Sequence, residues 1–173
     1  LDLDREVLGN DHEDLVYTLN NLATTLVDEG RYAEAIPFHA ESLALRRKHY
    51  GEPSAEVVVA LSNLGYAYAR KGDSAAAEDL LRAAVAMADT VFGPAHQRTA
   101  LANARLAIPL MHTGRADEAE PLLRGAIAVY SDNAREQSWR VGDLRRWLGE
   151  ALIAEGREQE GLTQLETSWS ILA

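Results

Sequence analysis

An all-α solenoid of stacked antiparallel helix pairs is the fold that the sequence predicts, on three observations. Glycine recurs at a step of 42 residues, at Gly30, Gly72, Gly114 and Gly156. Small residues recur at the same step. Within each 42-residue unit, apolar residues are three or four positions apart, as on one face of a helix. One helix pair cannot bury its own apolar face, so about four such units must stack.

The first unit, residues 11–51, shows how each element is predicted. Apolar residues from Leu15 to Leu26 follow the helical spacing, and Gly30 is suited to the turn that ends this helix. A second apolar series follows and closes near Gly51. Each unit is therefore expected to be a hairpin of two helices of about 18 residues. Small residues beside the turn let the two backbones approach closely.

The same register divides the rest of the chain. We expect residues 1–10 to be the end of a preceding helix, because Leu1 to Gly9 matches Leu43 to Gly51 at the 42-residue step. The expected repeats are 11–51, 52–93, 94–135 and 136–173, and together they form one solenoid, 1–173, cut from a longer chain.

The last repeat contains all three tryptophans, and two interpretations stay open. Trp139 and Trp147 flank a run with three arginines, which is typical of a binding hot spot. Alternatively the repeat is a C-terminal cap, in which Trp139 and Trp169 cover apolar surface that no further repeat would cover. Trp147 is the tryptophan that fits the cap least well.

Composition excludes several classes of function. The net charge of −10 is unfavourable for contact with phosphates or anionic lipids, so we expect neither nucleic acid nor membrane as a partner. The chain has no cysteine, which excludes disulfides and thiol catalysis and fits a cytoplasmic location. The sequence shows no catalytic motif, phosphate loop or metal-ligand spacing, so we expect no enzyme, no cofactor and no metal.

The acidic stretch "DHED", Asp11 to Asp14, combines carboxylates with a histidine and so raises the question of a metal site. It also stands where the first helix begins, and acidic residues there complement the helix dipole. We interpret it as a helix start in which Asp11 caps free N–H groups. His96 occupies the same slot as His12, which also indicates a feature of the repeat.

The repeat resembles the tetratricopeptide repeat, in the 42-residue form of kinesin light chains and many bacterial signalling proteins. The stretches that carry the resemblance are "TLNNLA" (Thr18 to Ala23), "LSNLGYAYARKG" (Leu61 to Gly72), "GRYAEAIP" (Gly30 to Pro37) and "GRADEAEP" (Gly114 to Pro121). The resemblance implies a right-handed superhelix. The first helices of its repeats line a concave groove for a peptide or a helix of another protein.

In this family the residue before the recurring leucine of each first helix faces the groove, and here that slot holds Asn21, Asn63, Arg105 and Trp147. An asparagine amide can bracket a peptide group, and Arg105 can pair with a carboxylate. The alternative interpretation is that the asparagines bridge neighbouring helices and tighten the stack. The neighbouring groove-side candidates are Tyr17, Asn20, Thr24, Ser62, Tyr66, Arg70, Ile108, Met111 and His112.

One subclass of the family is disfavoured by the residue types at these groove positions. Repeats that clamp the C-terminal carboxylate of chaperone tails use two lysines, and the matching slots here hold Asn20 and Leu101. Thr24 stands where that pattern has asparagine, so only Asn63 and Arg105 fit it. A chaperone clamp is therefore not expected.

The function that follows is a non-catalytic scaffold for protein–protein interaction, binding a peptide or helix in its groove. The alternative is a regulatory or self-association segment of a larger bacterial signalling protein, such as a kinase or a transcriptional regulator. The two differ in whether the repeats contact a separate protein or their own chain.

Overall fold

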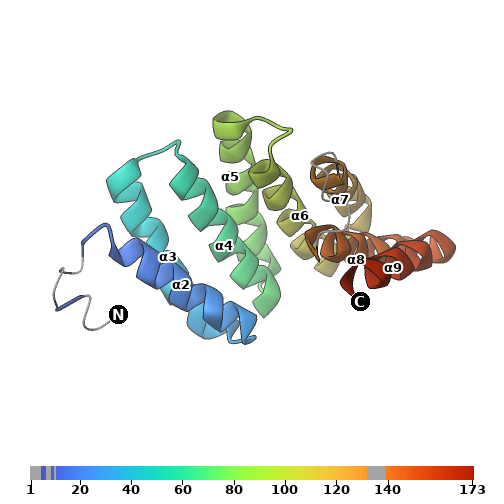
Figure 1. Cartoon of the computed structure of the whole chain (residues 1–173), viewed down its shortest axis with the longest axis horizontal. Coiled ribbons are helices and arrows are strands. Elements are labelled where there is room, and N and C mark those ends of the chain that lie inside the picture. The colour runs from blue at the N-terminus through green and yellow to red at the C-terminus, as the bar shows by residue number, and fades with distance from the viewer. Residues whose placement is uncertain (1–4, 7–8, 10, 132–138) are drawn as a thin grey trace. The chain divides into compact units, whose positions relative to one another are not determined.

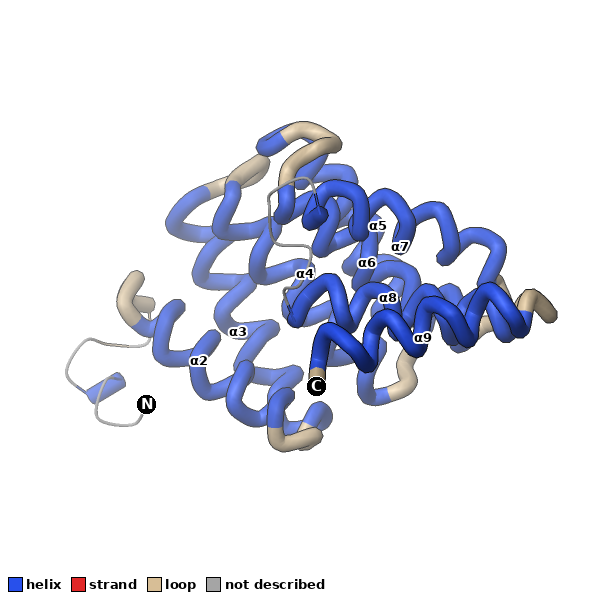
Figure 2. The backbone as a smooth tube through the Cα atoms, turned by 45° about the vertical axis from the view of Figure 1, so that its right-hand side comes forward, coloured by secondary structure: helices blue, strands red, loops and turns tan. Residues whose placement is uncertain are grey.

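The computed structural model describes residues 5–6, 9, 11–131 and 139–173, and every regular element in this part of the chain is an α-helix (Figures 1 and 2). The predicted all-α class is confirmed. The helices are α2 (Leu15–Asp28), α3 (Tyr32–Tyr50), α4 (Ala55–Lys71), α5 (Ser74–Phe92), α6 (Gln97–His112), α7 (Ala116–Ser131), α8 (Trp139–Ala154) and α9 (Glu158–Leu172).

Two predicted boundaries fall on residues outside this description. The border between the third and fourth repeats lies within 132–138, and the expected preceding helix, 1–10, is described only at residues 5, 6 and 9. In that segment Arg5 is described, and its guanidinium donates to both carboxylate oxygens of Glu41 on α3, at 2.9 and 2.6 Å.

The turns inside the four hairpins share one geometry, which explains the recurring glycine. Gly30 has a φ of 77°, a left-handed conformation that glycine adopts without steric cost. The N–H of Gly30 donates to the carbonyl of Val27 at 3.0 Å, and the N–H of Arg31 donates to that of Leu26 at 2.8 Å. This pair of bonds is a Schellman motif, and it recurs at Gly72, Gly114 and Gly156.

Three of these glycines are followed by an arginine that pairs with a glutamate in the first turn of the next helix. Arg31 donates to both carboxylate oxygens of Glu34, at 2.9 and 2.8 Å. Arg115 donates to both carboxylate oxygens of Glu118 in the same way, and Arg157 donates twice to one carboxylate oxygen of Glu160. Asp73 holds this place in the second hairpin, where its carboxylate accepts weakly from the N–H of Ala76 at 3.4 Å. The phrase "GRxxE" is thus a turn signal.

Small residues set the close approach of paired helices. A Cβ added to Gly65 on α4 would lie 2.6 Å from Leu81 of α5. One added to Gly149 on α8 would lie 2.8 Å from Leu165 and 2.9 Å from the carbonyl oxygen of Gly161. In the first hairpin Ala23 is fully buried at the same slot. A larger side chain at these slots would force the helices apart.

In the first three repeats, one slot at the start of the first helix accepts two residue types. The Nδ1 atoms of His12 and His96 accept from the backbone N–H two residues later, at 3.2 and 3.1 Å. Ser54 occupies the same slot in the second repeat, and its hydroxyl accepts from Val57 at 3.3 Å. The prediction that Asp11 caps the helix is wrong, because its carboxylate pairs with Lys48 at 2.8 Å instead.

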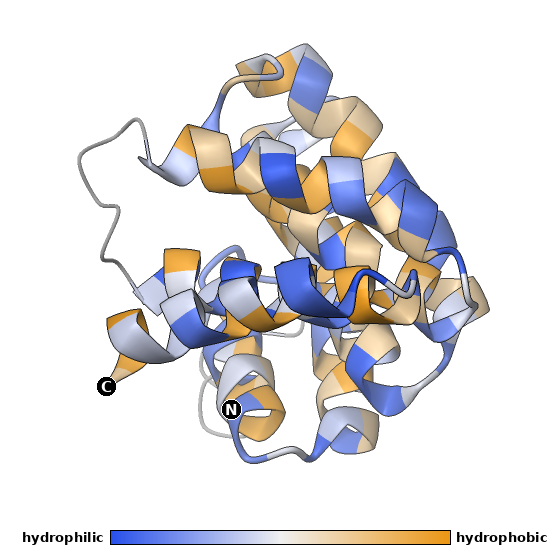
Figure 3. Ribbon diagram, turned by 90° about the vertical axis from the view of Figure 1, so that its right-hand side faces the viewer, coloured by the Kyte–Doolittle hydropathy of each residue, from blue (hydrophilic) through white to orange (hydrophobic). Residues whose placement is uncertain are grey.

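The chain forms two compact units, residues 1–91 and 92–173, and each contains two hairpins. Hydrophobic and hydrophilic residues alternate along the helices (Figure 3), and the buried residues are mostly apolar. Leu15, Leu19 and Leu61 are fully buried in the first unit, and Leu123 and Leu152 in the second. Burying a leucine contributes about 1.5–3 kcal/mol, so these residues dominate the stability of their units.

Candidate functional site

The predicted site residues lie on the first helices of the hairpins. Within the first unit these helices are α2 and α4, which contact one another; within the second unit they are α6 and α8, which do the same. Each unit therefore presents its own candidate face, made by two neighbouring first helices.

On the first unit, two predicted residues bind one another. The amide of Asn63 on α4 donates to the side-chain oxygen of Asn20 on α2 at 3.0 Å, and both residues are half-buried. This bond ties the two first helices together. It corresponds to the bridging interpretation of the asparagines.

Next to this pair, α2 presents Tyr17, Asn21 and Thr24 as an exposed row at helical spacing. Tyr17 is 58% exposed, which is high for so large an apolar ring. The hydroxyl of Thr24 donates to the backbone carbonyl of Asn20 at 2.8 Å, which fixes its rotamer. These three side chains provide polar and aromatic surface on one face.

Near the C-terminal end of α4, Arg70 joins two tyrosines. Its guanidinium lies 5.2 Å from the ring centre of Tyr32 and 5.7 Å from that of Tyr66, and it donates to both hydroxyls at 2.8 Å. Tyr66 and Arg70 were predicted, whereas Tyr32 was not. No repeat signal marks Tyr32, because its slot holds Ser74, Ala116 and Glu158 in the other repeats.

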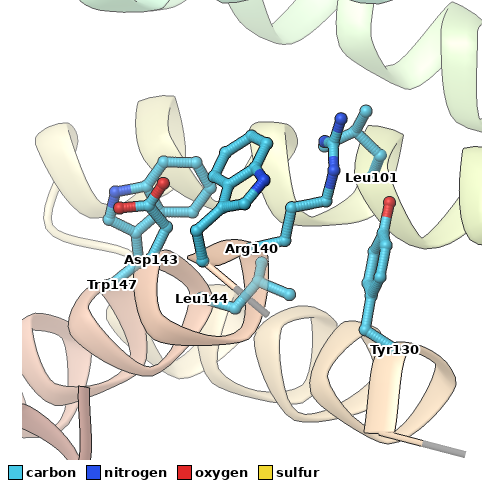
Figure 4. Close-up of a pocket in the computed structure, with 7 residues that line it drawn as sticks. Leu101, Tyr130, Arg140, Asp143, Leu144 and Trp147 are labelled. Atoms are coloured by element: carbon cyan, nitrogen blue, oxygen red, sulfur yellow. The ribbon is translucent and has the colours of Figure 1, made fainter. Parts of the chain in front are cut away.

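The second unit has a pocket on its candidate face (Figure 4). Its volume is about 40 Å³. Residues from three helices line it: Leu101 of α6, Tyr130 of α7, and Trp139, Arg140, Asp143, Leu144 and Trp147 of α8. Trp147 belongs to the predicted groove slot. Trp139 and Arg140 belong to the tryptophan and arginine cluster proposed as a hot spot.

Charged side chains surround the aromatic walls of this pocket. The guanidinium of Arg140 lies 4.5 Å from the ring centre of Trp139, and that of Arg146 lies 5.8 Å from the ring centre of Trp147. Figure 4 shows the side chain of Arg140 extending toward Leu101. Arginine stacked on tryptophan in this way is held by a cation–π attraction.

Tyr130 closes the pocket on the side of α7. Its hydroxyl donates to the backbone carbonyl of Gln97 at 3.1 Å. Burial raises the pKa of this phenol, while the nearby guanidinium groups of Arg140 and Arg105 partly oppose the rise. Tyr130 therefore stays neutral at physiological pH and acts as a wall and a hydrogen-bond donor.

The remaining predicted residues lie at different depths. Ser62 and Ile108 are each 5% exposed, so they pack the interior of their units and offer almost no surface to a partner. Arg105 and Met111 are half-buried, and His112 is exposed; none of these three lines the pocket.

Four pocket residues were not predicted as site residues: Leu101, Tyr130, Asp143 and Leu144. Tyr130 and Asp143 escaped prediction for different reasons. Tyr130 lies near the end of a second helix, a position that the groove pattern does not include. Asp143 shares its slot with Tyr17 and Leu101, so the spacing could have found it. Its residue type differs so much from theirs that the repeat gave no signal there.

A family profile for the tetratricopeptide repeat matches residues 1–48 and 14–90, which together make up more than half of the chain. The chain belongs to the tetratricopeptide-repeat family. Repeats of this family are generally scaffolds for protein–protein interaction, and typical members have no catalytic function. No curated protein matches the chain.

Solved structures share the fold. BtubC (BKLC) of P. vanneervenii is 19% identical with a TM-score of 0.74; the match covers 90% of this chain and 62% of BtubC. A kinesin light chain-like protein of Podospora anserina with nearly identical TPR-like repeats is 22% identical with a TM-score of 0.74, over 98% of this chain and 80% of that protein. MamA is 22% identical with a TM-score of 0.58, over 90% and 77%.

Two further findings concern the described part of the chain. No helix there is long and apolar enough to cross a membrane. No group of three or more His, Cys, Asp or Glu side chains there is arranged to hold a metal ion. This finding covers the stretch "DHED" as well.

Proposed function

We propose that this protein is a non-catalytic scaffold that binds a peptide or a helix of a partner protein on the faces formed by its first helices. The observation that carries the proposal is the pocket of the second unit, in which two tryptophans and two leucines line a small apolar space beside Arg140. Tryptophan and arginine are the residues most often found at the energetic centre of protein interfaces.

The size of this pocket selects the kind of ligand. At about 40 Å³ it is far below the roughly 300–1,000 Å³ of sites for cofactors and other small molecules. It accepts part of one apolar side chain, which would pack on Leu101, Leu144 and Trp147. Arg140 at its edge would hydrogen-bond a carbonyl or carboxylate of the same partner.

The face of the first unit offers polar contacts of its own. Asn21 and Thr24 are exposed on α2, and an asparagine amide offers both a donor and an acceptor to an extended peptide. We assign Asn21 to partner contact, while Asn20 and Asn63 hold the helices that present it. Contacts of this type read the peptide backbone and contribute about 1 kcal/mol each.

The experiment is a selection of peptide ligands from a random library, followed by calorimetry on the best binder. The proposal expects Trp147→Ala to weaken binding by at least tenfold, as for a hot-spot tryptophan. Trp169→Ala is the matched control, because Trp169 is an exposed tryptophan of the same unit that does not line this pocket. Equal affinity of the folded Trp147→Ala variant and the wild type would refute the assignment of the pocket.

A second arm tests three residues of the predicted groove slot, Asn21 and Asn63 of the first unit and Arg105 of the second. The Asn21→Ala, Asn63→Ala, Arg105→Ala triple variant should retain fewer partners from a lysate than the wild type, as compared by mass spectrometry. Circular dichroism would establish that the variant is folded. Equal retention would remove these three residues from the proposed site.

A further inference from the structure

The charges of the second unit are divided between its first and second helices. α6 contains Arg98 and Arg105 and no acidic residue, and α8 contains three arginines against Asp143 and Glu150. By contrast, α7 contains one arginine and three acidic residues, and α9 contains three glutamates and no basic residue. In a chain with a net charge of −10, the two first helices of the proposed peptide site therefore carry an excess of positive charge.

One slot of the repeat shows this division most clearly. In the 42-residue register it holds Asp14, Glu56, Arg98 and Arg140, so its charge changes sign between the two units. The slot lies at or beside the first residue of a first helix, where the helix dipole favours an acidic side chain and disfavours a basic one. Arg98 and Arg140 thus oppose the stability of their own helices, which is typical of residues retained for function.

Aromatic rings hold both of these arginines. The guanidinium of Arg98 lies 5.3 Å from the ring centre of Phe92, and that of Arg140 lies 4.5 Å from the ring centre of Trp139. A guanidinium that lies over a ring keeps its charge, and the N–H groups at its edge can form a forked pair of hydrogen bonds with a carboxylate. The rings therefore position two cations without neutralising them.

The arginines gather around Leu101, which lines the pocket. Arg98 precedes Leu101 by three residues and Arg105 follows it by four, so both lie on the same side of α6 as Leu101. Arg140 of α8 extends toward Leu101 (Figure 4). Burial raises the pKa of the Tyr130 phenol, and the guanidinium groups of Arg140 and Arg105 both act against this rise, so both lie near that wall of the pocket.

The acidic residues of α8 do not cancel this positive charge, because both are associated with another arginine. Glu150 pairs with Arg146 at 2.8 Å, and Asp143 lies 4.0 Å from the same guanidinium. The three side chains together carry a net charge of −1. The three arginines around Leu101 outweigh it.

We propose that the partner segment bound at this pocket is acidic, and that aspartate or glutamate side chains beside its apolar anchor pair with Arg98 and Arg140. This inference rests on the proposed function and adds the chemical class of the partner. Arg105 adds to the positive potential at the same place. Arg98 does not line the pocket, and its role is to select a carboxylate next to the anchor.

The distribution of charge favours a segment of protein over nucleic acid. A nucleic acid carries a negative charge at every phosphate and is bound by extended basic surfaces. Here the positive excess lies on α6 and α8, while the neighbouring helices α7 and α9 are both net negative. A short acidic segment needs only the pocket and the arginines beside it.

The selection of peptide ligands from a random library gives the first test. Ligands of the wild type should be enriched in aspartate and glutamate beside their apolar anchor. Replacing these residues by asparagine and glutamine should weaken binding about tenfold at low salt, and the difference should shrink between about 50 and 500 mM salt. Selected ligands that lack acidic residues but still depend on Trp147 would overturn this inference and leave the proposed function intact. Ligands that do not depend on Trp147 would overturn both.

Substitution of Arg98 tests the residue that gives the preference. Arg98→Glu should weaken binding of a selected acidic peptide by at least about tenfold, because it brings like charges together. The repeat accepts glutamate at this slot, as Glu56 shows, so the variant should keep its helical circular dichroism. Arg82→Glu is the matched control, since it makes the same change of net charge on α5 of the first unit. It should bind the acidic peptide as the wild type does.

Three further results would overturn the proposal. The first is an acidic peptide that binds the folded Arg98→Glu variant as tightly as the wild type. The second is an equal loss of affinity in Arg98→Glu and Arg82→Glu, which would assign the effect to the net charge of the chain. The third is a single-stranded DNA oligonucleotide that displaces the acidic peptide, which would make nucleic acid the partner.

Discussion

Two glycines of the second unit, both inside helices, have opposite roles. Gly149 of α8 has no room for a side chain, because an added Cβ would lie 2.8 Å from Leu165 and 2.9 Å from the carbonyl oxygen of Gly161. Gly125 of α7 is exposed, and nothing lies within 4 Å of the position of its missing Cβ. The first glycine is required by packing. The second only weakens its helix.

We therefore expect alanine substitutions to act in opposite directions. Gly149→Ala should lower the free energy of unfolding by about 1–3 kcal/mol, because overpacking outweighs the gain in helix propensity. Gly125→Ala should raise it by about 0.5–1 kcal/mol. Urea denaturation of the two variants measures both changes. A stabilised Gly149→Ala would mean that the helix pair can separate at little cost.

The histidine caps allow a second prediction at this scale. His96 accepts from the N–H of Arg98, and Ser54 performs the equivalent function in the preceding repeat. His96→Ala should lower the free energy of unfolding by about 1 kcal/mol, while His96→Ser should recover most of this loss. Thermal unfolding compares the three proteins. If serine does not restore the stability, the stacking of the His96 ring on Phe92, with ring centres 4.7 Å apart, contributes more to stability than the cap does.

At the scale of elements, arginines and glutamates connect the last two hairpins. Arg157, in the turn before α9, donates to Glu120 of α7 at 2.8 Å and to Glu160 of α9 at 2.6 Å. Arg124 of α7 also contacts both glutamates. The hydrogen bond from Arg124 lowers the pKa of Glu120 below its ordinary 4.5, and that from Arg157 lowers the pKa of Glu160.

These shifts predict how stability depends on pH. Because the folded pKa values lie below the unfolded ones, the network contributes stability that is present above about pH 4.5. This contribution is lost as the pH falls through the folded pKa values. Glu120→Gln should therefore melt at a lower temperature than the wild type at pH 7, and the difference should shrink toward pH 3. A difference that stays constant with pH would assign the effect of the substitution to packing.

At the scale of the whole molecule, the two compact units determine how far the effect of a substitution spreads. Gly65 contacts Leu81 within the first unit, and Gly149 contacts Leu165 within the second. In repeat proteins a perturbation acts mainly on neighbouring repeats. Gly65→Ala should therefore accelerate hydrogen exchange in α4 and α5 while leaving α8 and α9 unchanged. Mass spectrometry of the exchanged peptides measures this, and a uniform acceleration would show one cooperative unit instead.

The sequence predicted the fold more completely than the site. The helical spacing and the recurring glycines are local signals, so they located the hairpins and their turns. The pocket depends on side chains from three helices. Leu101 and Asp143 share a slot of the repeat, but no 42-residue period links them to Tyr130 or to the two tryptophans. The same limit applied to hydrogen bonds: Asn63 was correctly placed on a first helix, but its bond to Asn20 depends on how α2 and α4 pack.

At two recurring slots the residue type alternates from one repeat to the next, so the sequence has a period of two hairpins as well as one. The helix-start slot holds histidine in the first and third repeats, at His12 and His96, and serine between them at Ser54. The close-packing slot alternates between alanine and glycine, from Ala23 to Gly149. A period of two hairpins is left when an ancestral gene segment encoding a pair of hairpins is copied whole. The border between the compact units, at residues 91 and 92, falls next to Gly93, where the second repeat ends, so each unit contains one pair of hairpins.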